Sequence, residues 1–183
     1  MTDRGDDPRL GGRMVQRVIV DAAAIAARVR ELGAEITSAY PDGDLVVLGL
    51  LKGSFLFVAD LVREIRRPLQ LDFLVVSSYG NRTTSSGVVT LMYDPATSLS
   101  GRHVLVVDDI VDTGRTLGRL LDLLAARSPR SVEVCALLRK RDTAAERVPA
   151  RFVGFEAPNE FLVGYGLDHA EEFRHLPYIV SLR

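Results

Sequence analysis

Short runs of apolar residues with no polar alternation recur along the chain, and Leu45–Leu51 is the clearest of them. Turn-forming residues at 41–43 (Pro, Asp, Gly) precede it. A strand without a polar face is typical of a parallel sheet that helices cover on both sides. Similar short, turn-bounded segments predict further strands at Leu71–Ser77, Val88–Tyr93, His103–Val107 and Ser131–Leu138.

Segments with helical periodicity separate these strands. Helices are predicted at Asp21–Tyr40, Phe55–Ile65 and Thr116–Ala126. Asp21 and Ser54 stand where they can cap the first two helices. Strands that alternate with helices predict an α/β fold with a central, mostly parallel sheet flanked by helices.

The two ends of the chain differ from this pattern. Residues 1–14 are mostly polar and carry acids, bases, Gly and Pro, so we expect a disordered N-terminal tail before a single domain at 15–183. Beyond Arg139 the pattern becomes irregular, with short apolar pieces at Phe161–Val163 and Tyr178–Leu182. We expect about 150–183, with N-terminal contributions, to form a small hood on the main sheet.

Composition argues against several classes of function. The 23 basic and 24 acidic side chains leave a formal net charge of -1, so no overall field favours nucleic acid or an anionic membrane. No apolar stretch reaches the roughly 18 residues of a membrane span, and the N-terminus has no signal-peptide pattern. The single cysteine, Cys135, excludes an intrachain disulfide and fits a small buried hydrophobe. A cytoplasmic location is the expectation.

The segment Val104–Leu117 carries the most chemical information. An apolar strand leads into Asp108 and Asp109, then Asp112, and then a predicted helix start. Carboxylates at a strand end can hold a sugar diol or a divalent cation. Free N–H groups at a helix start favour a phosphate, and Gly114 permits close approach of the backbone. Neither GxxxxGK[ST] nor GxGxxG is present, so the pattern favours a ribose 5-phosphate over a triphosphate or dinucleotide.

This segment resembles the phosphoribosyl-pyrophosphate motif of the type I phosphoribosyltransferases, and Val15–Val180 resembles their hypoxanthine-guanine branch. The resemblance implies the fold of that family with a base-binding hood. It implies transfer of 5-phosphoribosyl from phosphoribosyl pyrophosphate to a 6-oxopurine base, with Mg²⁺ as cofactor. It also implies a homodimer or homotetramer.

The resemblance assigns roles within the acidic segment. Asp108 and Asp109 match the pair that holds the ribose hydroxyls and their magnesium. Asp112 matches the proposed general base near N7 of the purine. The 5-phosphate loop matches Thr113, Gly114, Arg115 and Thr116. Relatives also carry Lys or Asn at the position of Arg115.

Two loops match the parts that handle pyrophosphate and closure. Lys52 and Gly53 match the pyrophosphate loop, although this segment alone also fits a solvated turn. Ser78 and Tyr79 begin the segment that matches the mobile lid, which excludes water from the reacting centre. Without the resemblance, an ordinary polar hairpin loop is the alternative.

The base site is assigned in the same way. Lys140 matches the lysine that donates to the 6-oxygen, which selects against the 6-amino group of adenine. Phe161 matches the ring that stacks on the purine, although an aromatic core residue is the commoner role. Leu162 matches a backbone contact to the base edge. Asp168 matches a residue near a second magnesium, and Arg174 one that reaches the pyrophosphate.

Two alternatives stay open at this point. A non-catalytic regulator of the same fold tends to lack the base-site residues and to show a basic face. A transferase that prefers xanthine or another base would retain most of the same motifs. The sequence does not rank the three 6-oxopurines.

Overall fold

The computed structural model describes residues 7–78, 89–112, 114–140 and 149–182, and its centre is a six-stranded sheet in the order β4-β3-β2-β5-β6-β7. Neighbouring strands are parallel except for the antiparallel pair β3 and β4. The strands are β2 (Leu45–Leu51), β3 (Gln70–Ser78), β4 (Val89–Tyr93), β5 (His103–Val111), β6 (Ser131–Lys140) and β7 (Phe152–Ala157). The predicted α/β fold with a mostly parallel sheet is confirmed.

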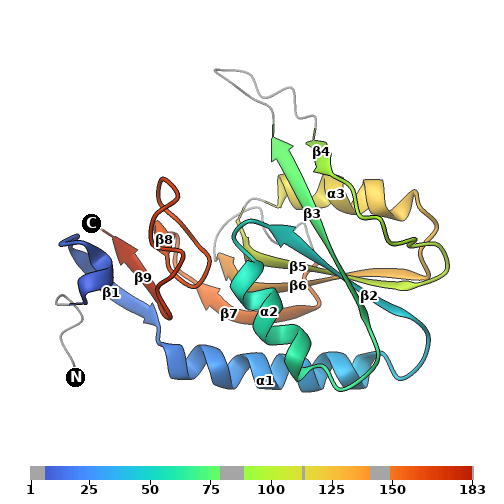
Figure 1. Cartoon of the computed structure of the whole chain (residues 1–183), viewed down its shortest axis with the longest axis horizontal. Coiled ribbons are helices and arrows are strands. Elements are labelled where there is room, and N and C mark those ends of the chain that lie inside the picture. Colours follow the sequence, from blue (N-terminus) through green and yellow to red (C-terminus); the bar gives the residue numbers. More distant parts are fainter. Residues whose placement is uncertain (1–6, 79–88, 113, 141–148, 183) are drawn as a thin grey trace.

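Helices cover both faces of this sheet (Figure 1). They are α1 (Ala22–Ala39), α2 (Phe55–Glu64) and α3 (Arg115–Ala125). Successive strand residues point to opposite faces. Leu45 and Val47 therefore pack with α1 and α2, whereas Val46 and Leu48 pack with α3. Cys135 is fully buried in the first of these layers, as predicted.

A second, antiparallel sheet forms the hood beside the main sheet (Figure 1). Its strands, in the order β1-β9-β8, are β1 (Val15–Val20), β9 (Ile179–Leu182) and β8 (Leu162–Val163). The hood has its own small core, formed by Leu10, Val163, Phe173, Leu176, Tyr178 and Val180. The hood is therefore built from both ends of the chain.

Residues 7–14 differ from the expected disordered tail, whereas residues 1–6 of that tail lie outside the described part of the chain. A 3₁₀ helix, Pro8–Leu10, places Leu10 in the hood core with 1% of its surface exposed. The Tyr178 hydroxyl donates a hydrogen bond of 2.6 Å to Asp7. The burial of Leu10 and the hydrogen bond to Asp7 hold this segment against the hood, although its composition is otherwise too polar to form a core.

Several strands extend beyond or lie outside the predicted boundaries, among them β1, which was not predicted. β5 continues to Val111 because Asp108 and Ile110 still pair with β6, so Asp108 and Asp109 belong to the strand and not to a turn after it. β6 likewise continues to Lys140. β7 was not predicted, and it joins the edge of the main sheet although it lies within the range assigned to the hood.

The helix starts test the predicted caps. Asp21 accepts a hydrogen bond of 2.9 Å from the Ala24 N–H and caps α1 as predicted. The capping prediction for Ser54 is wrong, because its hydroxyl donates instead to the Leu50 carbonyl at 2.7 Å. In the described part of the chain, no helix is both long and apolar enough to cross a membrane.

Candidate active site

The candidate site lies where β2, β5 and β6 end, at the carboxyl edge of the main sheet. Lys52 and Gly53 follow β2, Asp108 and Asp109 lie near the end of β5, and Lys140 is the last residue of β6. Because these three strands are adjacent and parallel, their ends meet at one edge. This edge is where open α/β sheets bind ligands.

Asp108 and Asp109 are two carboxylates in succession, of which Asp108 is buried and Asp109 is partly buried. Only 8% of Asp108 is exposed, and its side chain accepts a hydrogen bond of 3.0 Å from the Asp109 N–H. Burial raises the pKa of Asp108 well above its usual range, and the charge of Asp109 raises it further. Burial also raises the pKa of Asp109, against lowering contributions that include the charge of Arg174. Because burial disfavours the ionised form of both carboxyls, a bound cation or hydroxyl donors would stabilise the ionised pair.

A small hollow adjoins Asp108 at the start of α3. Its volume is about 130 Å³, and its lining includes Asp112, Gly114 and Thr116. Gly114 has a φ of 69°, in the left-handed region that glycine adopts without strain. The first N–H groups of α3 have no partner within the helix, so this hollow suits an anion. Thr113 and the side chain of Arg115 lie outside the described part of the structure.

The loop after β2 lies directly against Asp109. A Cβ added to Gly53 would lie 1.8 Å from Asp109 Oδ2, and one added to Gly166 would lie 1.9 Å from the Gly53 carbonyl oxygen. Two glycines thus allow the loop to fit between β5 and the hood. The Leu51–Lys52 peptide bond is cis.

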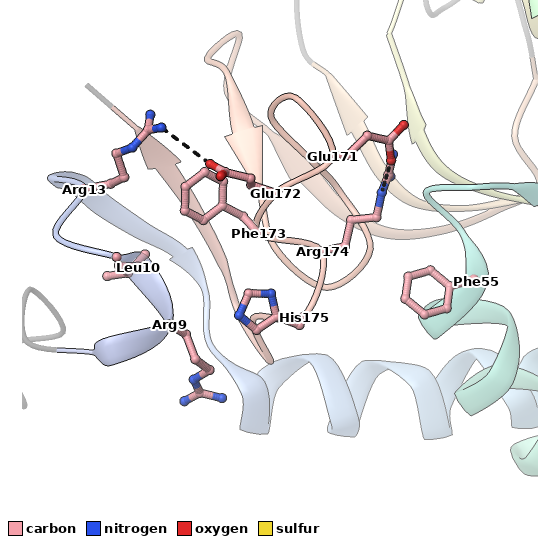
Figure 2. A pocket seen from close by; sticks show the side chains of 10 residues that line it. Arg9, Leu10, Arg13, Phe55, Glu171, Glu172, Phe173, Arg174 and His175 are labelled. Carbon is pink, nitrogen blue, oxygen red and sulfur yellow. Dashed lines mark hydrogen bonds and ion pairs between the residues drawn. The ribbon is translucent and has the colours of Figure 1, made fainter.

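A charged cluster in the hood completes this side of the site (Figure 2). Arg174 donates to the Gly166 carbonyl at 2.8 Å and pairs with Asp168 at 2.8 Å. Arg174 also pairs with Glu171 at 2.9 Å, and Glu171 pairs with Lys52 at 3.0 Å. Lys52 and Arg174, which the sequence assigned to one pyrophosphate, therefore contact the same carboxylate. Glu171 was not predicted, because an isolated acidic residue in a loop has no pattern that distinguishes it.

The residues assigned to the base lie further along the edge. Lys140 Nζ lies 3.1 Å from Asp112 Oδ2, and 15% of the lysine side chain is exposed. Phe161 is 57% exposed just before β8, and its ring meets that of His169 edge-on at 5.2 Å between centroids. The side chain of Leu162 is buried in the core, so only its backbone remains for a ligand.

The assigned metal residues do not form one ligand set. Asp168 is bonded to Arg174 and accepts from the Glu171 N–H at 2.9 Å. Within the described ranges, no three His, Cys, Asp or Glu side chains gather in a metal-binding arrangement. The adjacent carboxylates Asp108 and Asp109 still fit Mg²⁺, since this ion commonly takes one or two carboxylates and completes its shell with substrate phosphates and water.

The lid residues cannot be placed. Tyr79 and the side chain of Ser78 lie outside the described part of the structure. Their assignment stays a prediction.

Comparisons with known proteins agree with this arrangement. Residues 16–170 match the family described as the phosphoribosyl transferase domain. A hypoxanthine-guanine phosphoribosyltransferase of Dictyostelium discoideum is 47% identical over 174 residues, which cover 93% of this chain and 97% of the relative. One of Bacillus subtilis is 45% identical over 169 residues, 92% of this chain and 94% of the relative. A crystal structure of a hypoxanthine phosphoribosyltransferase from Staphylococcus aureus superposes with a TM-score of 0.88 at 40% identity, covering 92% of each chain.

Proposed function

The chain belongs to the phosphoribosyltransferase family, and from this premise we propose that it is a hypoxanthine-guanine phosphoribosyltransferase of purine salvage. It joins hypoxanthine or guanine to the ribose 5-phosphate of phosphoribosyl pyrophosphate and releases IMP or GMP with pyrophosphate. The observation that carries the proposal is the order of groups along one sheet edge. A small hollow at α3 is lined by Asp108 and Asp112, and Asp112 in turn pairs with Lys140 at the end of the neighbouring strand.

The phosphoribosyl group would bind at the hollow and at the carboxylates of Asp108 and Asp109. Its 5-phosphate fits the hollow at the start of α3, where helix N–H groups and the Thr116 hydroxyl are available as donors. Its ribose hydroxyls would then donate to Asp108 and Asp109. Lys52 and Arg174 supply two positive charges for the pyrophosphate, and the planar guanidinium can bind two phosphate oxygens at once. These groups position the ribose carbon for attack without a covalent bond to the protein.

The purine base would bind at the Asp112–Lys140 pair. A 6-oxopurine presents its 6-oxygen and N7 on the same edge. Lys140 donates to the 6-oxygen while Asp112 accepts from the N7–H, and the 3.1 Å between their polar atoms suits two neighbouring groups on that edge. As N9 bonds to the ribose carbon, the bond to pyrophosphate breaks and the N7 proton passes to Asp112. Adenine would place its 6-amino donor against the lysine donor.

Magnesium fits the same site. When bound with phosphoribosyl pyrophosphate, Mg²⁺ neutralises charge on the departing pyrophosphate. Asp108 and Asp109 would hold the ion that is associated with the ribose hydroxyls. Asp168 is the residue assigned to a second ion. A cytoplasmic location and a homodimer or homotetramer are proposed from the resemblance alone.

The test is an assay of the purified chain with phosphoribosyl pyrophosphate and Mg²⁺, in which hypoxanthine, guanine, xanthine and adenine are offered separately. We expect IMP and GMP to form and adenine to remain unconverted. The rate with xanthine relative to the other two bases decides whether the enzyme prefers that base. No turnover with any base would reject the proposal in favour of a regulator that binds the nucleotide.

A further inference from the structure

Glu171 holds together the two cations that the proposed function assigns to pyrophosphate. Its Oε1 accepts from Lys52 Nζ at 3.0 Å, and its Oε2 accepts from an Arg174 guanidinium nitrogen at 2.9 Å. Lys52 comes from the loop after β2 and Arg174 from the hood, so only this carboxylate joins them among the interactions of the described residues. Figure 2 shows the pair between Glu171 and Arg174. The two carboxylate oxygens of Glu171 thus accept from the donors that the proposed function assigns to phosphate oxygens.

The backbone around Glu171 fixes this placement. Its N–H donates to Asp168 Oδ2 at 2.9 Å, and its φ is 68°, in a region that residues other than glycine rarely adopt. Ala170 and Phe173 also have positive φ values, of 51° and 72°. A short loop that holds several such residues presents one side chain in a defined direction, and such strain commonly accompanies functional sites.

A displaced Glu171 side chain has space to move into. Glu171 borders a hollow of about 550 Å³ between the N-terminal segment, the hood loop and Phe55 (Figure 2). Arg9, Arg13 and His175 also line this hollow. Leu10, Phe55, Phe173 and Glu172 complete most of the lining, so a carboxylate that leaves Lys52 finds basic groups in this hollow beside apolar ones.

We propose, on the basis of the proposed function, that Glu171 is an internal counter-ion that occupies the pyrophosphate position between Lys52 and Arg174 and is displaced when pyrophosphate binds. Glu171 lowers the affinity for pyrophosphate because the ligand must first break its two ion pairs. The same competition helps the product to leave, since Glu171 can reclaim both cations. Glu171 is therefore a positioning residue and makes no contact with the reacting atoms.

The expected effect is modest because the pairs are exposed. The side chains of Glu171 and Lys52 are 63% and 68% exposed, so solvent weakens their attraction. Loss of both pairs, together with removal of a negative charge beside the ligand, is expected to tighten pyrophosphate binding about three- to tenfold.

The experiment compares Glu171→Gln with Glu172→Gln, which removes the same charge from the next residue. Glu172 pairs with Arg13 and contacts neither Lys52 nor Arg174 in the described interactions. Titration calorimetry measures the dissociation constant of pyrophosphate in the presence of Mg²⁺, and steady-state rates give KM for phosphoribosyl pyrophosphate. We expect Glu171→Gln to lower both values about three- to tenfold, and Glu172→Gln to leave them within about twofold of wild type.

Two further results separate the counter-ion role from general electrostatics and from the proposed function. In a Lys52→Met background, the gain from Glu171→Gln should shrink, because one of its two partners is already absent. Weaker or unchanged binding in Glu171→Gln, an equal effect in Glu172→Gln, or no pyrophosphate binding by the wild type would overturn the inference. Tight pyrophosphate binding without turnover by the wild type would instead reject the proposed function and leave the counter-ion role supported by the binding data.

Discussion

Replacement of Gly53 by alanine tests how closely the loop after β2 must approach the acidic strand. The new Cβ would lie 1.8 Å from Asp109 Oδ2 and 2.5 Å from its Cγ. To reach an ordinary contact of 3.4 Å, the loop or the carboxylate must recede by about 1.6 Å. Asp109 is held in turn by a hydrogen bond of 3.0 Å from the Ile110 N–H, so the displacement affects the centre of the site.

The size of the effect follows from that displacement. A misplacement of about 1 Å in a catalytic site costs on the order of 100-fold in rate. We therefore expect Gly53→Ala to lower kcat/KM for phosphoribosyl pyrophosphate at least about 100-fold, or about 2.7 kcal/mol of transition-state stabilisation. Initial rates of IMP formation from hypoxanthine measure this loss, and thermal unfolding verifies that the variant is folded.

Gly101→Ala is the matched control for this substitution. Gly101 has a φ of 72° and nothing within 4 Å of an added Cβ, so alanine there costs about 1 kcal/mol of stability but creates no clash at the site. We expect the control to keep wild-type kinetics. If folded Gly53→Ala retained kcat/KM within about threefold of wild type, the close approach of the loop to Asp109 would not be part of the active arrangement.

Three further predictions concern single side chains. Asp112→Ala should lose about 100-fold or more in turnover while it keeps most of its affinity for phosphoribosyl pyrophosphate, as measured by steady-state rates and calorimetry; wild-type turnover would exclude Asp112 as the base. Lys140→Ala should lower the preference for hypoxanthine over adenine about tenfold or more in kcat/KM, and an unchanged ratio would show that another group reads the 6-oxygen. Burial raises the pKa of Tyr40 from 10.0 to about 12, and its hydroxyl has no partner among the described residues. Tyr40 therefore ionises at a lower pH in the unfolded chain than in the folded one. Its contribution to the free energy of unfolding is full below pH 10 and is lost as the pH rises through about 12. Tyr40→Phe should gain about 1 kcal/mol at neutral pH and lose less stability than wild type at about pH 11 in denaturant unfolding; equal losses in the two proteins would contradict the pKa shift.

The sequence predicted the parts of the fold that hydrophobic patterns determine locally. Leu45–Leu51 is a strand with the predicted bounds, because an apolar run between turn residues has few other structures available. The end of β5 was placed too early because Asp108 and Asp109 interrupt the apolar run. Only the pairing with β6 keeps these two residues extended, and a partner strand cannot be seen in a local pattern.

Other features depend on contacts between distant segments. β7 has a mixed burial pattern, and Gly154 lies so close to β6 that an added Cβ would be 2.4 Å from the Leu137 carbonyl oxygen. Leu10 is buried by hood residues more than 150 positions away in the chain. Neither feature has a periodicity that predicts it.

The candidate site was predictable only in part for the same reason. Asp108, Asp109 and Asp112 could be selected because they cluster between an apolar strand and a predicted helix start. Glu171 could not, because its importance arises from its contacts with Lys52 and Arg174 in the folded chain. The roles assigned to these residues stay predictions until the variants are measured.

The stoichiometry of products tests the central claim most directly. The purified chain is incubated with hypoxanthine, phosphoribosyl pyrophosphate and Mg²⁺, and IMP and pyrophosphate are quantified by chromatography over time. The account predicts equal amounts of the two products, and neither product when adenine replaces hypoxanthine. Consumption of phosphoribosyl pyrophosphate without incorporation of the base, or the absence of both products from a folded chain, would contradict it.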